Sequence, residues 1–100
     1  MTEPAVDLGI LLAIASSARD IAIPADTVVF GEVGLSGEIR SVAMAEQRVR
    51  EAQKLGFRTV ILPKSCMRAL SGIRESSPIN LIPVSNIGEA IGYLNALKKA

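Results

Sequence analysis

Several residue types on which catalytic sites depend are scarce or absent in this chain. Histidine and tryptophan are absent, and cysteine occurs once among the 100 residues. The absence of histidine removes the side chain that most often serves as a general base or as a metal ligand. Because Cys66 stands alone, a disulfide framework and a structural zinc cluster within this chain are both excluded. We expect Cys66 to be a small buried residue rather than a reactive thiol.

Features that favour nucleic-acid binding are also few. Aromatic residues make up 3% of the chain, as Phe30, Phe57 and Tyr93, so few rings remain for stacking on single-stranded bases. The formal net charge is +1, from 11 basic and 10 acidic residues. A chain this close to neutral exerts no global electrostatic attraction on a phosphate backbone. Contact with DNA would therefore need a local patch of basic side chains.

No stretch of the sequence is typical of a targeting signal or a membrane span. Its first residues do not combine a basic segment with an apolar one, as a signal peptide would. The apolar run at residues 8–15 is far too short to cross a bilayer. A lone cysteine fits a reducing compartment. These features predict a cytoplasmic location and no membrane partner.

The composition is that of one small folded domain with an aliphatic core. Apolar residues make up 49% of the chain and charged residues 21%, which distinguishes it from a disordered segment. A helix is predicted near residues 4–15, with Asp7 at its positive end and apolar residues on nearly all of its sides. We therefore expect this helix to be buried on most sides. Residues 27–33 are predicted to form one strand, which turns at 34–37 and pairs back with 38–42.

The second half of the chain alternates helices with strands. The predicted order is a helix at 45–55, a strand at 57–62, a short helix at 64–70, a loop at 71–78, a strand at 79–84 and a helix that Ser85 or Asn86 caps. Pro83 lies inside the last strand and indicates an edge strand or a strand end. A strand–helix–strand order implies parallel pairing with right-handed crossovers. The predicted fold class is α/β or α+β, in two or three layers.

Residues 29–40 read VFGEVGLSGEIR, with two turn glycines and three fixed charges. This stretch resembles a signature of the RadA family of DNA repair and recombination proteins, also called Sms, and the resemblance covers roughly residues 3–65. It implies that residues 1–100 form a single partial Lon-protease-like domain, similar to domain 2 of ribosomal protein S5. That fold is a three-layer mixed sheet with helices, and we expect its N-terminal strands to be missing here.

The resemblance also implies where the family's cofactors belong. It assigns ATP and zinc to segments of the family that this sequence does not contain. The phosphate-binding pattern G-x-x-x-x-G-K-[ST] is absent from the 100 residues. We therefore expect no cofactor and no metal in this chain. The expected role is that of a scaffold that joins copies of the protein into a ring and contributes to DNA contact, while branch migration and unwinding belong to other segments.

The resemblance raises the question of a protease site, because active Lon enzymes use a serine nucleophile with a lysine base. An ungapped alignment on the signature puts Ala5 at the position of the serine and Glu46 at that of the lysine. A methyl group cannot attack a carbonyl carbon, and a glutamate cannot replace the amine. We therefore expect no peptidase activity. The alternative is a degenerate fragment of an ATP-dependent Lon-type serine protease, in which another serine pairs with Lys54 or Lys64, although surface positions are usual for lysines.

Five basic residues form the candidate DNA-contact surface, which we call the basic strip: Arg40, Arg48, Arg50, Lys54 and Arg58. Arg50 and Lys54 are four residues apart and share a helix face. In a ring, several copies would multiply a weak attraction for phosphates. The alternative is an ordinary mixed-charge surface, because Glu46 and Glu51 are interleaved with these cations.

Three charged residues flank the turn of the predicted hairpin. Glu32, Glu38 and Arg40 either pair with one another across the two strands or contact a neighbouring subunit. The sequence does not decide between these two interpretations.

Overall fold

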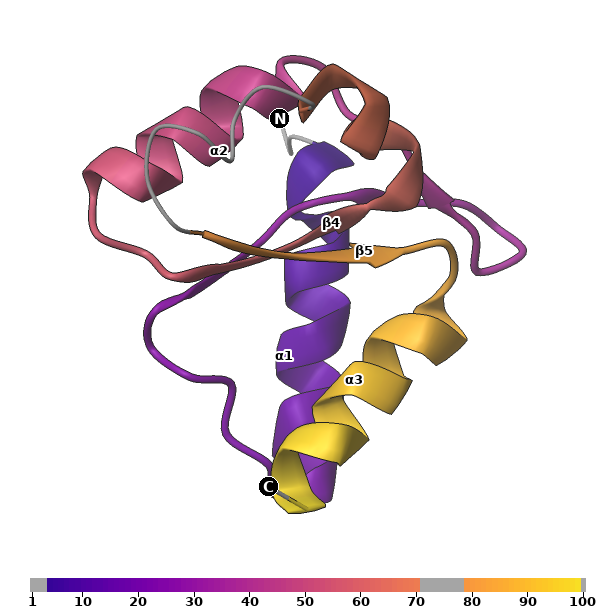
Figure 1. The fold of residues 1–100 in the computed structure, drawn as a ribbon. Coiled ribbons are helices and arrows are strands. Elements are labelled where there is room, and N and C mark those ends of the chain that lie inside the picture. Colours follow the sequence, from indigo (N-terminus) through magenta and orange to yellow (C-terminus); the bar gives the residue numbers. More distant parts are fainter. Residues whose placement is uncertain (1–3, 71–78, 100) are drawn as a thin grey trace.

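A computed structural model describes residues 4–70 and 79–99 of the chain (Figure 1). Its elements are, in order, the 3-10 helix η1 (Pro4–Val6), α1 (Asp7–Arg19), β1 (Thr27–Val29), β2 (Glu32–Val33), β3 (Ile39–Arg40), α2 (Ala45–Lys54), β4 (Thr59–Pro63), the 3-10 helix η2 (Lys64–Leu70), β5 (Asn80–Val84) and α3 (Ile87–Lys99). The predicted loop at 71–78 lies outside the described residues.

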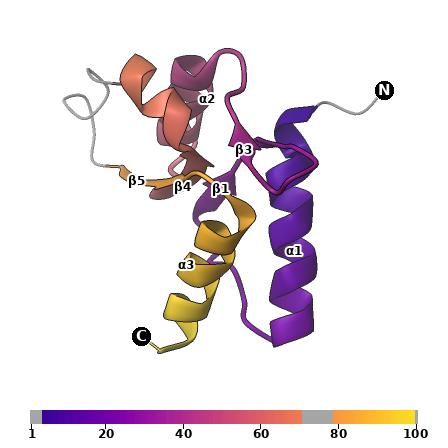
Figure 2. The same ribbon diagram turned by 90° about the vertical axis from the view of Figure 1, so that its right-hand side faces the viewer.

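A parallel sheet of three strands, in the order β1-β4-β5, forms the middle layer. Thr27 of β1 is paired with Thr59 of β4, which in turn is paired with Asn80 of β5. The helices α2 and η2 cover one face of the sheet, and α1 and α3 lie side by side on the other (Figure 2). The predicted α/β class and the predicted parallel pairing are therefore confirmed, in three layers.

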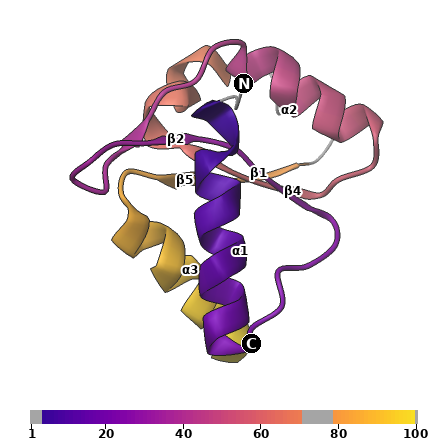
Figure 3. The same ribbon diagram turned by 180° about the vertical axis from the view of Figure 1, so that it is seen from behind.

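Helix α1 is buried along one side only. Leu8, Leu12 and Ala15 recur at helical spacing and are all buried, which stabilises the fold by roughly 1.5–3 kcal/mol for each leucine. Ile10 and Ile14 face outward, with 50% and 61% of their surfaces exposed. The prediction that this helix is buried on most sides is wrong. Its packing partners, the sheet and α3, all lie on the same side of it (Figure 3).

The predicted strand at residues 27–33 is divided in two. β1 joins the parallel sheet, whereas β2 pairs with β3 in a separate antiparallel hairpin. At the division, the N–H of Gly31 donates to the carbonyl of Ala5 at 2.8 Å, and the carbonyl of Gly31 accepts from the N–H of Leu8 at 3.0 Å. The prediction of a single strand was wrong, because the backbone at Gly31 bonds to η1 and to the first turn of α1. The predicted hairpin is confirmed, with a shorter return strand.

Strand β4 is the buried centre of the sheet. Val60, Ile61 and Leu62 are no more than 2% exposed, as a continuous apolar strand between two helical layers should be. Val60 and Leu62 pack on the side of α2, together with Val49. Ile61 packs on the side of α1 and α3. One strand thus supplies apolar side chains to both halves of the core.

The chain enters α3 through a side-chain cap. The Oδ1 atom of Asn86 accepts the N–H of Glu89 at 2.9 Å, and the Glu89 carboxylate accepts the N–H of Ser85 at 2.6 Å. This reciprocal pattern satisfies N–H groups that a helix start leaves without partners, and it confirms Asn86 as the cap. Among the described strands β5 lies at the edge of the sheet, which confirms the interpretation of Pro83.

Candidate functional site

The two positions that the resemblance assigns to the Lon dyad lie in unlike surroundings. Ala5, in η1, is 3% exposed, and its carbonyl is bonded to Gly31. Glu46 lies in the first turn of α2, and its Oε2 is 2.9 Å from Nη2 of Arg50. A buried methyl group and an ion-paired carboxylate supply neither a nucleophile nor a lysine-type base at these positions.

The three charges of the hairpin pair with one another. Arg40 stands directly opposite Glu32 in the ladder, and its Nη1 is 3.5 Å from Oε1 of Glu32. Its Nη2 is 3.0 Å from Oε2 of Glu38. The cross-strand interpretation is confirmed, while contact with a neighbouring subunit stays a prediction. Two carboxylates against one guanidinium leave this cluster with a net negative charge, which does not attract a phosphate backbone.

The same contacts shift two pKa values. Hydrogen bonds from its own backbone N–H and from the Arg40 guanidinium lower the pKa of the Glu38 carboxyl from its ordinary value of 4.5. In return, the hydrogen bond to Glu38 and its charge raise the pKa of Arg40. Both groups are therefore charged at neutral pH. Their exposure keeps the contribution of this ion pair to stability small.

The helical part of the basic strip is also engaged. Arg50 forms the predicted i,i+4 pair with Glu46. The guanidinium of Arg48 lies over the ring of Phe30, 5.9 Å from its centroid, and its Nε donates to the carbonyl of Ala43 at 3.0 Å. Such a stacked and bonded guanidinium is held in place by its own fold. These two cations are therefore less available to a ligand than their charge alone suggests.

The basic strip extends from the end of the sheet at which the parallel strands begin to the end at which they finish. Arg40 is the last residue of β3, and the next residue, Ser41, is hydrogen-bonded to Ser65 just beyond the end of β4. Arg58 precedes β4, and its N–H donates to the carbonyl of Asp26 before the start of β1. Because Arg58 and Arg40 lie near opposite ends of the parallel strands, the strip does not form a compact cluster. Its contact with DNA stays a prediction.

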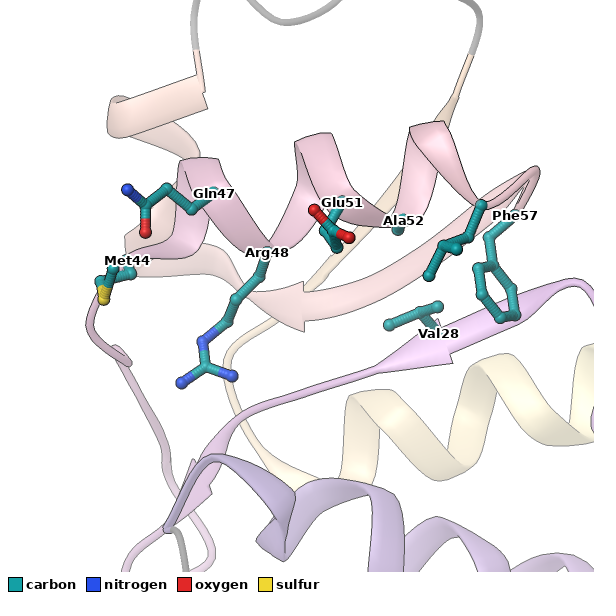
Figure 4. A pocket seen from close by; sticks show the side chains of 8 residues that line it. Val28, Met44, Gln47, Arg48, Glu51, Ala52 and Phe57 are labelled. Atoms are coloured by element: carbon teal, nitrogen blue, oxygen red, sulfur yellow. The ribbon is translucent and has the colours of Figure 1, made fainter.

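A hollow between α2 and β1 was not anticipated from the sequence (Figure 4). It has a volume of about 530 Å³ and is lined by Val28, Met44, Gln47, Arg48, Glu51, Ala52, Leu55 and Phe57. Met44 and Leu55 are 62% and 68% exposed, and Phe57 lies at the far end from Met44. Apolar walls with few polar groups suit an apolar partner. The sequence offers one signal: Leu55, which directly follows α2, is exposed although its helical spacing from the buried Ala52 predicts burial.

A second unanticipated hollow, of about 690 Å³, lies beside η2. It is lined by Lys64, Ser65, Met67, Arg68 and Pro83. Its signal in the sequence is the change from a buried strand to basic and hydroxyl residues after Pro63. Polar residues at that point of a parallel strand often contribute to ligand sites.

Other chemistry is sparse in the part of the chain that the structure describes. Over residues 4–70 and 79–99, no group of three or more His, Cys, Asp and Glu side chains is placed to hold a metal ion. Within those ranges, no helix is both long enough and apolar enough to cross a membrane. Cys66 is 4% exposed, which confirms it as a buried residue.

Comparison with known proteins tests the resemblance to RadA that the sequence indicated. The profile of a family described as subunit ChlI of Mg-chelatase matches residues 2–66. DNA repair protein RadA of Aquifex aeolicus is 44% identical over 92 residues, which make up 92% of this chain and 19% of that protein. DNA repair protein RadA of Bacillus subtilis is 48% identical over 92 residues, or 91% of this chain and 19% of that protein. The RadA protein of Synechocystis is 45% identical over 89% of this chain.

The chain thus spans about 19% of the length of the first two curated relatives. The resemblance to RadA is confirmed over most of the chain, including the tail, where the sequence pattern alone was weaker. The chain belongs to the family described as subunit ChlI of Mg-chelatase, and it is similar to one segment of DNA repair protein RadA.

Proposed function

We propose that this chain is a non-catalytic, Lon-like assembly domain of a RadA-type DNA repair protein, which joins copies of the protein and contributes to DNA contact. The observation that carries the proposal is the outward side of α1, together with Val6 at the end of η1 directly before it. Val6, Ile10 and Ile14 recur every four residues and are 41%, 50% and 61% exposed. Scattered apolar residues are ordinary on a surface, whereas an apolar stripe along one helix is typical of an interface. We call these three residues the α1 stripe.

A hollow beside the α1 stripe supports the same proposal. It has a volume of about 250 Å³, lies between α1 and α3, and is lined largely by apolar side chains, among them Leu11, Ile14, Ile87 and Ile91. A protruding apolar side chain of a neighbouring copy would fill it. Each copy has both the α1 stripe and this hollow, so the stripe of one copy can pack into the hollow of the next in a homo-oligomer.

The DNA part of the proposal rests on the relatives and on the cations. Each relative named above is called a DNA repair protein. In the described ranges, Lys54 and Arg58 of the basic strip form no ion pair, so their charges are not neutralised locally. ATP-driven branch migration and the zinc and ATP sites are assigned to other segments of RadA-type proteins. The expected cytoplasmic location is part of the same proposal.

The proposal excludes a peptidase activity for this chain. Support comes from Ala5, which is buried, and from Glu46, which is paired with Arg50. The degenerate-protease alternative needs a serine–lysine pair elsewhere. In the described part of the chain no serine is hydrogen-bonded to a lysine, so no such pair is assembled to support that alternative.

Sedimentation velocity over a range of protein concentrations tests the assembly role. We expect the sedimentation coefficient of the wild-type chain to rise with concentration. A double variant of the stripe, Ile10→Glu with Ile14→Glu, should sediment as a monomer, because an unpaired carboxylate is costly to bury in an interface. Leu35→Glu is the control, because Leu35 is fully exposed at the hairpin turn and is not part of the α1 stripe. A wild-type chain that remains monomeric at high concentration contradicts the proposal.

A further inference from the structure

We propose that the hollow beside η2 is a binding site for a phosphate ester, held by Lys64 and Arg68 with the hydroxyl of Ser65. Met67 and Pro83 complete its lining. The proposal rests on the proposed function in one respect, the choice of a DNA phosphodiester as the ester. It lies outside the basic strip, because neither Lys64 nor Arg68 belongs to that set.

The site lies at the carboxyl ends of the parallel strands. Lys64 directly follows the last residue of β4, and Pro83 is the next-to-last residue of β5. Pro63 and Val84, the final residues of these two strands, are paired with each other. Ligands of open α/β sheets bind outside the carboxyl ends of the strands, which is the side on which this hollow lies. The fold thus brings the two cations to a common place next to the strand ends.

The charges in the hollow favour an anion. Within residues 4–70 and 79–99, Lys64 and Arg68 form no ion pair, in contrast to Arg40 and Arg50. Among the described residues no carboxylate lines the hollow. Guanidinium and ammonium groups are the side chains that bind phosphate oxygens most often, the guanidinium through two parallel N–H groups. Two cations without local neutralisation match the charge of a phosphate monoester dianion or of two adjacent phosphodiesters of DNA.

A hydroxyl pair adds hydrogen-bonding capacity to the same place. The Oγ atoms of Ser41 and Ser65 are hydrogen-bonded to each other, and both residues are exposed. One hydroxyl of the pair donates, so the other retains a proton that can be given to a phosphate oxygen. The bond also ties the segment after the hairpin to the start of η2. Met67 and Pro83 add an apolar wall suited to the sugar of an ester.

The test compares matched charge reversals in the full chain. The site variant is Lys64→Glu with Arg68→Glu, and the control is Lys54→Glu with Arg58→Glu, which makes the same charge change on the basic strip. Binding of a fluorescein-labelled DNA duplex is followed by anisotropy over a salt series. In a second arm, inorganic phosphate is titrated into ¹⁵N-labelled protein, and the amide signals of Ser41, Ser65 and Arg68 are followed. A neutral variant, Lys64→Gln with Arg68→Gln, and circular dichroism check that the fold is kept.

We expect the site variant to bind DNA at least tenfold more weakly, and the slope of log affinity against log salt to fall by about 2 because two phosphate contacts are lost. The control should lose less affinity. Inorganic phosphate should shift the three amide signals in the wild type but not in either site variant.

Other outcomes separate the two proposals. If DNA binds and the site variant keeps its affinity and slope, the site is overturned while DNA contact by this domain stands. If DNA does not bind but phosphate shifts the three signals, the site stands and the DNA part of the proposed function fails. If neither DNA nor phosphate binds, both the phosphate site and the DNA part of the proposed function are overturned.

Discussion

At the scale of single residues, Gly31 illustrates how one position joins two parts of the fold. It lies between β1 and β2, and its two backbone hydrogen bonds go to Ala5 of η1 and to Leu8 in the first turn of α1. A Cβ atom there would lie 3.1 Å from Cγ2 of Ile39 and 3.3 Å from Cβ of Leu8. Leu8 is 1% exposed and Ile39 is 7% exposed, so neither side chain has room to move away. The helix can approach the strand this closely because residue 31 has no side chain.

We predict that Gly31→Ala lowers the free energy of unfolding by about 1–3 kcal/mol, the usual cost of overpacking a core. Gly92→Ala is the matched control. Gly92 lies within α3, and no atom outside its own helix environment would lie within 4 Å of the added Cβ. There the same change should raise the free energy of unfolding by about 0.5–1 kcal/mol, because alanine favours the helix. Urea denaturation measures both; similar effects in the two variants would contradict the packing argument.

The lowered pKa of Glu38 predicts a dependence on pH. A carboxyl whose pKa is lower in the folded state stabilises the fold above its ordinary value of 4.5, and this stabilisation is lost as the pH falls through the lower folded value. Glu38→Gln removes the titrating group. The difference in melting temperature between wild type and variant should be largest above about pH 5 and should shrink toward about pH 3. A difference that stays constant over this range would show that the charge of Glu38 has no part in it.

At the scale of elements, the sequence predicted the identity of most helices and strands, but not where the backbone changes partners. The apolar pattern of residues 57–62 predicted β4 correctly, because burial on both faces leaves a continuous apolar run. The same kind of run at 27–33 hid the division at Gly31. Side-chain patterns report which residues are buried, whereas hydrogen-bond partners depend on the tertiary position of α1.

The outward side of α1 was missed for a related reason. Its isoleucines look like core residues in the sequence, and only the arrangement of layers shows that nothing described packs against Ile10 and Ile14. The candidate site was likewise predictable from the sequence only in part. The i,i+4 pair of Glu46 and Arg50 was predictable because local spacing determines it. The hollow of Lys64 and Arg68 was not, because it forms between two elements that meet only in the folded chain.

The cap of α3 gives a prediction at this scale. Asn86→Ala removes the acceptor for the N–H of Glu89 and should lower the free energy of unfolding by about 0.5–2 kcal/mol. Asn95→Ala is the matched control, because Asn95 is exposed in the interior of the same helix, where alanine is the better helix former. Thermal denaturation by circular dichroism should show a loss at position 86 and no loss at position 95. Equal effects would mean that the cap bond does not stabilise the helix.

At the scale of the whole molecule, the two helical layers leave different apolar surfaces open. On one side, α2 and η2 enclose a core that contains Phe30 and the inward side chains of β4. On the other side, α1 and α3 bury Leu8 and Leu94 but leave the α1 stripe and the hollow between the helices open. The α2 side has a hollow of its own, between α2 and β1, so both faces keep an apolar opening, and the α1 face adds the exposed α1 stripe. The exposed α1 stripe is what the proposed assembly role needs, while Lys64 and Arg68 lie where β4 ends, on a different part of the molecule.

The whole chain should also lack peptidase activity, and the burial of Ala5 gives a physical reason for this prediction. Ala5 is 3% exposed and its carbonyl is bonded to Gly31, so even a hydroxyl introduced at this position would be enclosed by the junction of η1 with the strand. We expect neither the wild-type chain nor the double variant Ala5→Ser with Glu46→Lys to release fluorescent peptides from labelled casein. Trypsin at a low concentration serves as the positive control for the assay. Cleavage by the wild type that a serine-directed inhibitor abolishes would contradict the assignment of a non-catalytic domain. Cleavage by the double variant alone would show instead that only the two side chains, and not the enclosure of residue 5, separate this fold from an active enzyme.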